Sequence, residues 1–144
     1  MNFKTLLIAA SLALPLSAHA YQLDRTIDCS LSVHDFFAPL VQSHAIQTPA
    51  FRTMARGVNA FHKSSNDALT FFNMTVGDVV GYSDEPLFFI TSDAPDRPEG
   101  YGFLVNAPIA EVQAVMSSIG NTAAQVRRLQ PDVTYIFCEV PRPQ

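Results

Sequence analysis

Residues 58–76 read Val-Asn-Ala-Phe-His-Lys-Ser-Ser-Asn-Asp-Ala-Leu-Thr-Phe-Phe-Asn-Met-Thr-Val, and this stretch decides the fold class. Its two ends, residues 58–62 and 69–76, are short and rich in Phe and β-branched residues, which is typical of strands. The residues between them, 63–67, are polar. Because a parallel pair needs a long crossover connection, two strands this close together favour antiparallel pairing. The stretch therefore predicts a β-hairpin with a polar loop.

The residues before this hairpin predict a helix over residues 32–46. Ser32 can cap its first turn, and Asp35 lies three residues later, as in a capping box with Asp in the usual place of Glu. Thr48-Pro49 ends the helix, since a residue before proline disfavours helical backbone angles. Residues 50–57 are ambiguous and fit one or two further helical turns. Apolar residues recur on one side of the helix at helical spacing: Val33, Phe36, Phe37, Leu40, Val41 and Ala45.

The residues immediately after the hairpin predict two more strands. Gly77-Asp78 and Gly81 indicate turns. Residues 86–91 and 101–105 are apolar runs of strand length. The residues between these runs, 92–100, hold two prolines, three acids and an arginine, a composition typical of a loop.

The last third of the chain predicts a second helix and a second hairpin. The helix begins near Pro108, a residue suited to a first helical position, and Gly120-Asn121 ends it. Residues 125–129 and 133–140 then flank Gln130-Pro131-Asp132, in which proline presets the backbone for a turn. The order of elements predicts an α+β fold: a mostly antiparallel sheet of about five or six strands with two main helices packed on one face.

The first 20 residues predict a secretory signal peptide. A single charge, Lys4, precedes an apolar run over residues 6–16, and Ser17-Ala18-His19-Ala20 places alanine at the −3 and −1 positions of a cut before Tyr21. The run is shorter than the roughly 20 residues that span a bilayer, so we expect no stable membrane insertion. Residues 21–144 are then expected to form a single globular domain, periplasmic or secreted.

The two cysteines, Cys29 and Cys138, predict one disulfide. Export carries them into an oxidising compartment, where an even number of cysteines usually pairs. The spacing does not fit a C-x-x-C redox motif. Two buried free thiols are the remaining alternative.

The charge of the exported chain is acidic. Without Lys4 it has eight Lys and Arg against 13 Asp and Glu, a formal net charge of −5. Nucleic-acid binding requires clustered basic residues, and only Arg127 and Arg128 are adjacent, so we expect no nucleic-acid partner. An acidic surface favours a basic protein partner, such as a basic enzyme acting on the cell envelope, or a neutral ligand.

No motif in the chain predicts catalysis, a metal site or a cofactor. His34, His44 and His62 do not have the spacing of metal ligands, and no nucleophile elbow or phosphate-binding glycine pattern is present. We therefore predict no catalytic residue, no metal site and no cofactor. Three scattered histidines can still converge in space, which keeps a dispersed site of histidine and a loop carboxylate as an alternative.

Two loops instead predict a recognition surface, because Tyr and Arg dominate many interfaces and prolines reduce the entropy lost on ordering. The predicted binding residues are Tyr82, Ser83, Asp84, Glu85, Asp93, Asp96, Arg97, Glu99 and Tyr101. The alternative is that both loops are ordinary solvated turns with the tyrosines packed at the edge of the sheet.

These observations favour an exported protein-binding module over an enzyme. Its most concrete form is an inhibitor or immunity-type protein that masks a toxic or cell-wall-degrading enzyme. The alternatives are a small exported enzyme with a dispersed site, and a protein that holds a small apolar ligand between helix and sheet.

Overall fold

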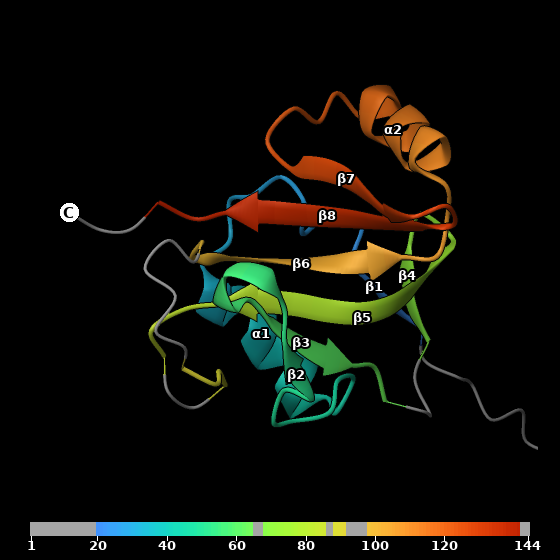
Figure 1. The fold of residues 1–144 in the computed structure, drawn as a ribbon. Coiled ribbons are helices and arrows are strands. Elements are labelled where there is room, and N and C mark those ends of the chain that lie inside the picture. Colours follow the sequence, from blue (N-terminus) through green and yellow to red (C-terminus); the bar gives the residue numbers. More distant parts are fainter. Residues whose placement is uncertain (1–19, 65–67, 86–87, 92–97, 142–144) are drawn as a thin grey trace, which may run out of the picture.

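The computed structural model describes residues 20–64, 68–85, 88–91 and 98–141. Two helices and a sheet make up this part of the chain, and most of the sheet pairing is antiparallel (Figure 1). The α+β prediction is therefore confirmed. The elements are β1 (Tyr21–Gln22), α1 (Val33–Gln42), β2 (Arg52–Thr53), the 3₁₀ turn η1 (Ala55–Gly57), β3 (Asn59–His62), β4 (Leu69–Phe71), β5 (Met74–Tyr82), β6 (Gly100–Val105), α2 (Ile109–Ser118), β7 (Gln125–Gln130) and β8 (Val133–Glu139).

The sheet is larger than the five or six strands predicted, since the described residues form eight strands. Its main path runs β1-β4-β5-β6-β8-β7, while β3 pairs with β5 and β2 pairs with β3. The β1–β4 pairing is parallel, which makes the sheet mixed. Two of the strands that were not predicted, β1 and β2, have two residues each. Segments this short carry no alternating pattern, so nothing in their sequence distinguishes them from a loop.

The hairpin predicted over residues 58–76 is wrong in its pairing. β3 and β4 both pair antiparallel with β5, as His62 opposite Asp78 and Phe71 opposite Met74. The tight turn lies at Phe72-Asn73, where both residues have positive φ, 44° and 64°. Asn adopts this left-handed conformation readily and Phe does not. Because an aromatic residue occupies the turn, the sequence pattern over residues 69–76 resembles one continuous strand.

β5 then continues through Gly77 and Gly81, so the turns predicted at these glycines are wrong. The register of β5 against β6 shifts between Val76 and Val79, which identifies a β-bulge there. A bulge accommodates an extra residue without ending the strand. At Gly81, an added Cβ would lie 2.5 Å from a ring carbon of Phe37, so the absent side chain leaves room for α1.

Helix α1 begins as predicted and ends early. The Asp35 backbone N–H donates to Ser32 Oγ at 3.0 Å, so Ser32 is the N-cap. The helix ends at Gln42, four residues before the predicted end, and His44 has a φ of 56°. Residues 50–57 form β2 and η1 rather than further helical turns.

The C-terminal predictions agree closely with the structure. Helix α2 begins after Pro108, and Gly120 follows it with a φ of 67°. β7 and β8 form the predicted hairpin around Pro131-Asp132.

Of the two apolar runs predicted as strands in the middle of the chain, residues 101–105 lie within β6. The run 86–91 does not form the predicted strand over its described residues, 88–91.

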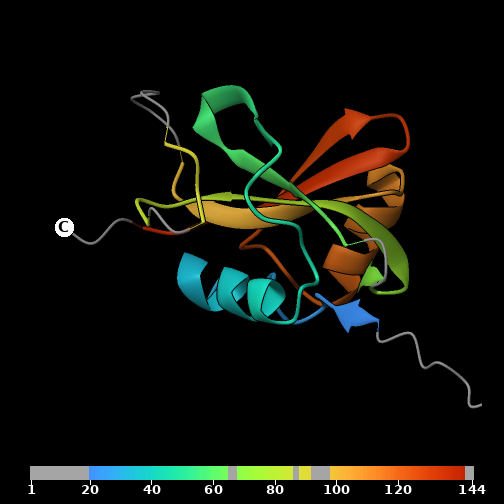
Figure 2. The same cartoon turned by 90° about the horizontal axis from the view of Figure 1, so that it is seen from below.

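The larger apolar cluster joins the helices to the sheet. Figure 2 shows α1 against one side of the sheet. Phe36 and Phe37 of α1, Val112 and Met116 of α2, and Phe103 of β6 all belong to this cluster. A second, smaller cluster is built from Val58, Ala60, Val80, Leu104 and Phe137.

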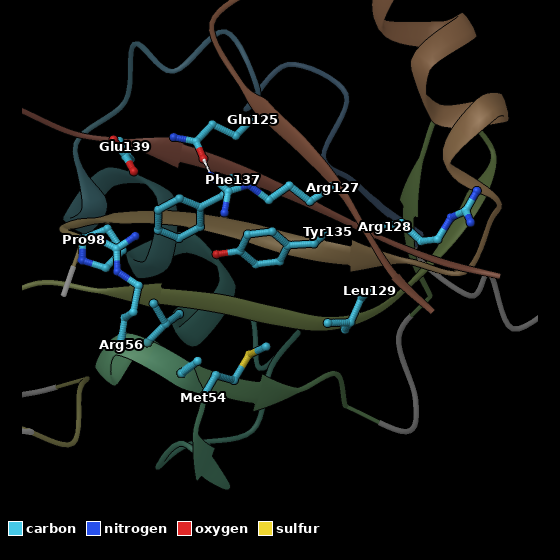
Figure 3. Close-up of a pocket in the computed structure, with 12 residues that line it drawn as sticks. Met54, Arg56, Pro98, Gln125, Arg127, Arg128, Leu129, Tyr135, Phe137 and Glu139 are labelled. Carbon is cyan, nitrogen blue, oxygen red and sulfur yellow. Dashed lines mark hydrogen bonds between the residues drawn. The ribbon is translucent and has the colours of Figure 1, made fainter. Parts of the chain in front are cut away.

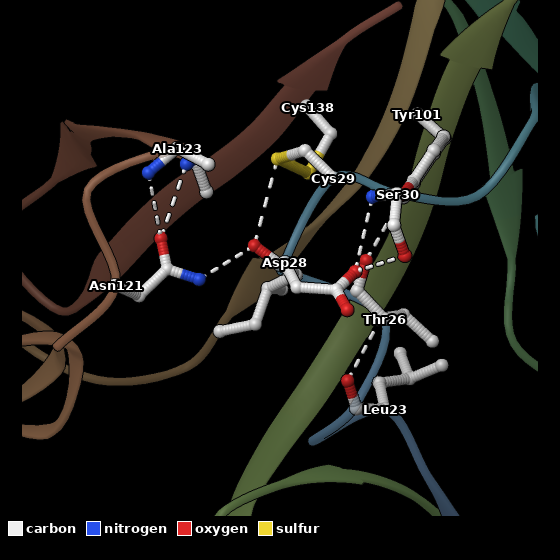
Figure 4. The surroundings of a disulfide bond; sticks show 11 residues. Leu23, Thr26, Asp28, Cys29, Ser30, Tyr101, Asn121, Ala123 and Cys138 are labelled. Carbon is white, nitrogen blue, oxygen red and sulfur yellow. Dashed lines mark hydrogen bonds between the residues drawn. A yellow bond between two sulfur atoms is a disulfide. The ribbon is translucent and has the colours of Figure 1, made fainter. Parts of the chain in front are cut away.

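The predicted disulfide joins Cys29 to Cys138 and ties the segment before α1 to β8 (Figure 4). Next to it, Asn121 Nδ2 donates to the carbonyl of Ile27 at 2.6 Å. The Asp28 carboxylate accepts hydrogen bonds from the backbone N–H and hydroxyl of Ser30, which lower the pKa of Asp28. The bridge and these hydrogen bonds hold residues 27–30 against the last strand and the loop after α2.

Candidate functional site

A trough lies on the face of the sheet opposite α1 (Figure 3). Strands β2 and β3 rise on one side of it and the β7–β8 hairpin rises on the other (Figure 2). The cavity within it has a volume of about 250 Å³. Its lining residues are Met54, Ala55, Arg56, Val58, Pro98, Gln125, Arg127, Arg128, Leu129, Tyr135, Phe137 and Glu139.

The floor of the trough is aromatic. Tyr135 and Phe137 stack in parallel, with ring centroids 5.5 Å apart and an interplanar angle of 12°. Side chains alternate across a strand, so these two face the trough while Ile136 between them belongs to the core on the helix side. Gly100 permits this packing, because an added Cβ would lie 2.9 Å from the ring of Phe137.

Charged side chains form the rim of the trough. Arg56, Arg127 and Arg128 carry positive charge, and Glu139 is the acidic residue among those that line it. The Arg127 guanidinium donates to Gln125 Oε1 at 2.9 Å, which holds it above the β7–β8 pair. Among the residues that line the cavity, arginines outnumber acids, whereas acids outnumber basic residues in the whole chain.

The hydroxyl of Tyr135 lies inside the trough and points along its floor (Figure 3). Burial raises the pKa of this tyrosine strongly, Arg127 and Arg56 counteract the rise, and Glu139 adds to it. The phenol is therefore protonated at neutral pH and can donate a hydrogen bond. No residue within the described part of the chain forms a hydrogen bond with it. A half-buried tyrosine hydroxyl usually has a partner.

The residues predicted to form a recognition surface are distributed differently. Tyr82 and Tyr101 are each 1% exposed and Ser83 is buried, so their side chains belong to the interior. Tyr101 stacks on Phe36 and donates to the carbonyl of Thr26 at 3.1 Å.

The charged members of that predicted surface do not form one cluster among the described residues. Asp84 is exposed and accepts a hydrogen bond from the Tyr82 hydroxyl. Glu85 contacts His34, and Glu99 is half-buried beside Pro98 at the edge of the trough. Asp93, Asp96 and Arg97 lie outside the described residues.

Two of the three histidines among the described residues pair with carboxylates. His34 Nδ1 lies 3.0 Å from Glu85 Oε1, and His62 Nδ1 lies 2.9 Å from Asp78 Oδ1. Phe51 stacks on the ring of His62 with centroids 3.5 Å apart. No contact in the described structure joins the histidines to one another. No group of three or more potential metal ligands occurs in the part of the chain that the structure describes.

Sequence reasoning missed the trough because its two sides come from distant parts of the chain. One signal was available. Gln125, Arg127 and Leu129 lie at alternate positions of β7, and Tyr135, Phe137 and Glu139 lie at alternate positions of β8, so the hairpin as a whole presents a mixed charged and aromatic face. The opposite side, Met54 to Val58, has no comparable pattern.

Comparison with known proteins gives no relative for this chain. No family model, curated protein or solved structure matches it. Among the described residues, no helix is long and apolar enough to cross a membrane. The geometry of the trough is therefore the main evidence about function.

Proposed function

We propose that this chain is an exported protein-binding module that masks the surface of a partner protein, as an inhibitor or immunity-type protein does. The observation that carries the proposal is the trough itself. It combines an aromatic floor with an arginine-rich rim on a face of the sheet that α1 leaves uncovered. Interfaces are enriched in Tyr, Phe, Met and Arg at their centres, and Tyr and Arg supply many of the residues that dominate binding.

Exposed apolar side chains lie in and near this surface. Leu129 on β7 is 45% exposed and Phe51 next to β2 is 41% exposed. Leu129 lines the cavity together with Met54 and Tyr135, and Phe51 lies three residues before Met54 in the sequence. Single exposed apolar residues are common on proteins, but a group around a cavity is more typical of a binding site.

Export supports the masking role, because it would place the module beside toxic or envelope-degrading enzymes. The signal-peptide pattern ends at Ala20, and β1 begins at the next residue, Tyr21. Removal of residues 1–20 would leave every described strand pairing intact. The Cys29–Cys138 bridge suits an oxidising compartment. The mass of the protein recovered from a periplasmic extract tests this part: a mass corresponding to residues 21–144 supports export, and retention of residues 1–20 contradicts it.

A site-specific crosslinking experiment tests the binding surface. A photoreactive phenylalanine analogue is placed at Leu129, and the matched control carries it at Ile119, which is 42% exposed and lies outside the trough. We expect one protein to be crosslinked from position 129 and not from position 119, and to lose its activity when an equimolar amount of this chain is added. Equal crosslinking from both positions, or a captured protein whose activity is unaffected, would contradict the proposal.

A further inference from the structure

We infer that the trough recognises an extended segment of its partner in which a carboxylate side chain lies next to a large apolar side chain. Arg127 and the Tyr135 hydroxyl would bind the carboxylate, and the apolar side chain would fill the cavity against Met54 and Phe137. This inference rests on the proposed function and specifies the chemistry of the partner.

The positive charge of arginine in the trough favours a carboxylate in the partner segment. Arg127, an exposed arginine that lines the trough, acts electrostatically on the Tyr135 hydroxyl, although the chain as a whole has an excess of acids. Net charge acts on partners at long range and is screened by salt over roughly 10 Å, whereas the groups in contact are selected by local charge. The planar guanidinium of arginine matches the two oxygens of a carboxylate. The acidic net charge therefore does not prevent an acidic segment from binding here.

The Tyr135 hydroxyl favours the same chemistry in the partner segment. It lies in the trough without a hydrogen-bond partner among the described residues, and it is protonated at neutral pH. It can therefore donate to an incoming group. A hydrogen bond to an ionised acceptor is about twice as strong as one to a neutral acceptor. With Arg127 acting on the same hydroxyl electrostatically, the group that best satisfies both is an anion.

The size of the cavity favours a single side chain as its occupant. Sites for drug-sized molecules usually measure about 300–1,000 Å³, and the cavity in the trough has a volume of about 250 Å³. It therefore suits a single large side chain better than a whole metabolite. Because the cavity lies at the surface, with lining residues from η1 on one side and β7 on the other, the remainder of a protein segment can extend out of it.

Binding of short end-blocked peptides to the protein lacking residues 1–20 tests the inference. The probes are Ac-Ser-Glu-Phe-Ser-NH₂ and Ac-Ser-Phe-Glu-Ser-NH₂, with the same peptides carrying Gln or Lys in place of Glu. Amide chemical shifts report both affinity and location. We expect the Glu peptides to shift resonances of residues 125–129 and 133–137, with about tenfold tighter binding than the Gln peptides.

Variants separate a specific site from general charge attraction. Arg127→Gln and Tyr135→Phe are each expected to reduce the preference for Glu over Gln by at least threefold. The matched control, Arg25→Gln, removes the same charge from an exposed arginine that lines a different surface hollow, and is expected to leave the preference unchanged. The dispersion of the amide spectrum verifies that each variant is folded.

The outcomes distinguish this inference from the proposed function. Equal binding of the Glu and Gln peptides in the trough, or tighter binding of the Lys peptides, would overturn the inference and leave the binding surface in place. Failure of all the peptides to shift trough resonances would also overturn it. The proposed function is decided separately by crosslinking from position 129.

Discussion

Asn59 binds Ile90 through both ends of its side-chain amide. Oδ1 accepts the Ile90 backbone N–H at 2.6 Å, and Nδ2 donates to the Ile90 carbonyl at 3.0 Å. Asn59 is fully buried. It therefore supplies the backbone of residue 90 with the hydrogen bonds that a neighbouring strand would otherwise provide. The adjacent Phe89 packs against Phe37 at a centroid distance of 5.0 Å, so this clamp also holds an aromatic ring in the core.

Replacement of Asn59 by Leu is expected to destabilise the protein by about 2–4 kcal/mol, because it leaves the N–H and carbonyl of Ile90 without partners. Urea unfolding monitored by circular dichroism measures the change. Gln113→Ala, which removes an exposed amide from α2, serves as the control and is expected to change stability by less than about 0.5 kcal/mol. Equal stability of the two variants would show that the hydrogen bonds between Asn59 and Ile90 do not contribute to the free energy of unfolding.

Gly100 allows β6 to approach β8 closely beneath the trough. A Cβ at this position would lie 2.1 Å from the carbonyl oxygen of Cys138, a distance that real side chains do not adopt. Gly100→Ala is therefore expected to cost about 2 kcal/mol or more in unfolding free energy. Gly77→Ala is the control, because its nearest contact is 3.3 Å away on the side chain of Asn106; it should cost less than about 1 kcal/mol. If the two variants unfold at the same denaturant concentration, the close approach is not real.

The Cys29–Cys138 disulfide joins residues 109 positions apart. On the chain-entropy model a bridge over a loop of this length stabilises the folded state by about 4–5 kcal/mol. We expect the double variant Cys29→Ser, Cys138→Ser to lose much of this stability and to become insensitive to reducing agent, whereas reduction should destabilise the natural chain. Mass spectrometry without reduction should find the natural chain two hydrogens lighter than its reduced form. A mass equal to that of the reduced form would contradict the bridge.

We expect ionisation of Tyr135 to lower the free energy of unfolding at alkaline pH. Its pKa is raised in the folded state, so above about pH 10 the unfolded chain releases the phenolic proton while the folded chain retains it. This contribution to stability is fully present below pH 10 and declines as pH rises further. Tyr135→Phe should match the natural chain at pH 7 and exceed it by about 1 kcal/mol at pH 11, as measured by urea unfolding at both pH values. An equal loss in both proteins between pH 7 and 11 would assign the effect to other groups.

Local chemistry was sufficient to predict several elements from the sequence alone. The N-cap at Ser32 depends on residues three positions apart, and the turn at Pro131-Asp132 depends on the fixed backbone angle of proline. The stop of α2 depends on Gly120, which takes the left-handed conformation observed there. The Cys29–Cys138 pairing was predictable for a different reason, since two cysteines allow a single intramolecular bridge.

Other elements depended on contacts between distant residues. Phe72 adopts a positive φ that is unfavourable for its type, and the Asp24 carboxylate accepts its backbone N–H at 2.8 Å from 48 positions away. Such a contact is invisible in a window of neighbouring residues. For the same reason the hairpin predicted over residues 58–76 was paired wrongly, because β3 and β4 each pair with β5 and not with each other.

The sequence by itself determined an α+β chain with an export pattern, a capped first helix, a C-terminal hairpin and one disulfide. Only the tertiary structure placed Tyr82 and Tyr101 in the interior and brought Arg56 beside Arg127 and Tyr135 in the trough. The physical reason is that capping, turn geometry and alternation act between near neighbours in the chain. A binding surface instead requires side chains from separate strands to meet, and the pairing and curvature of the whole sheet decide where they meet.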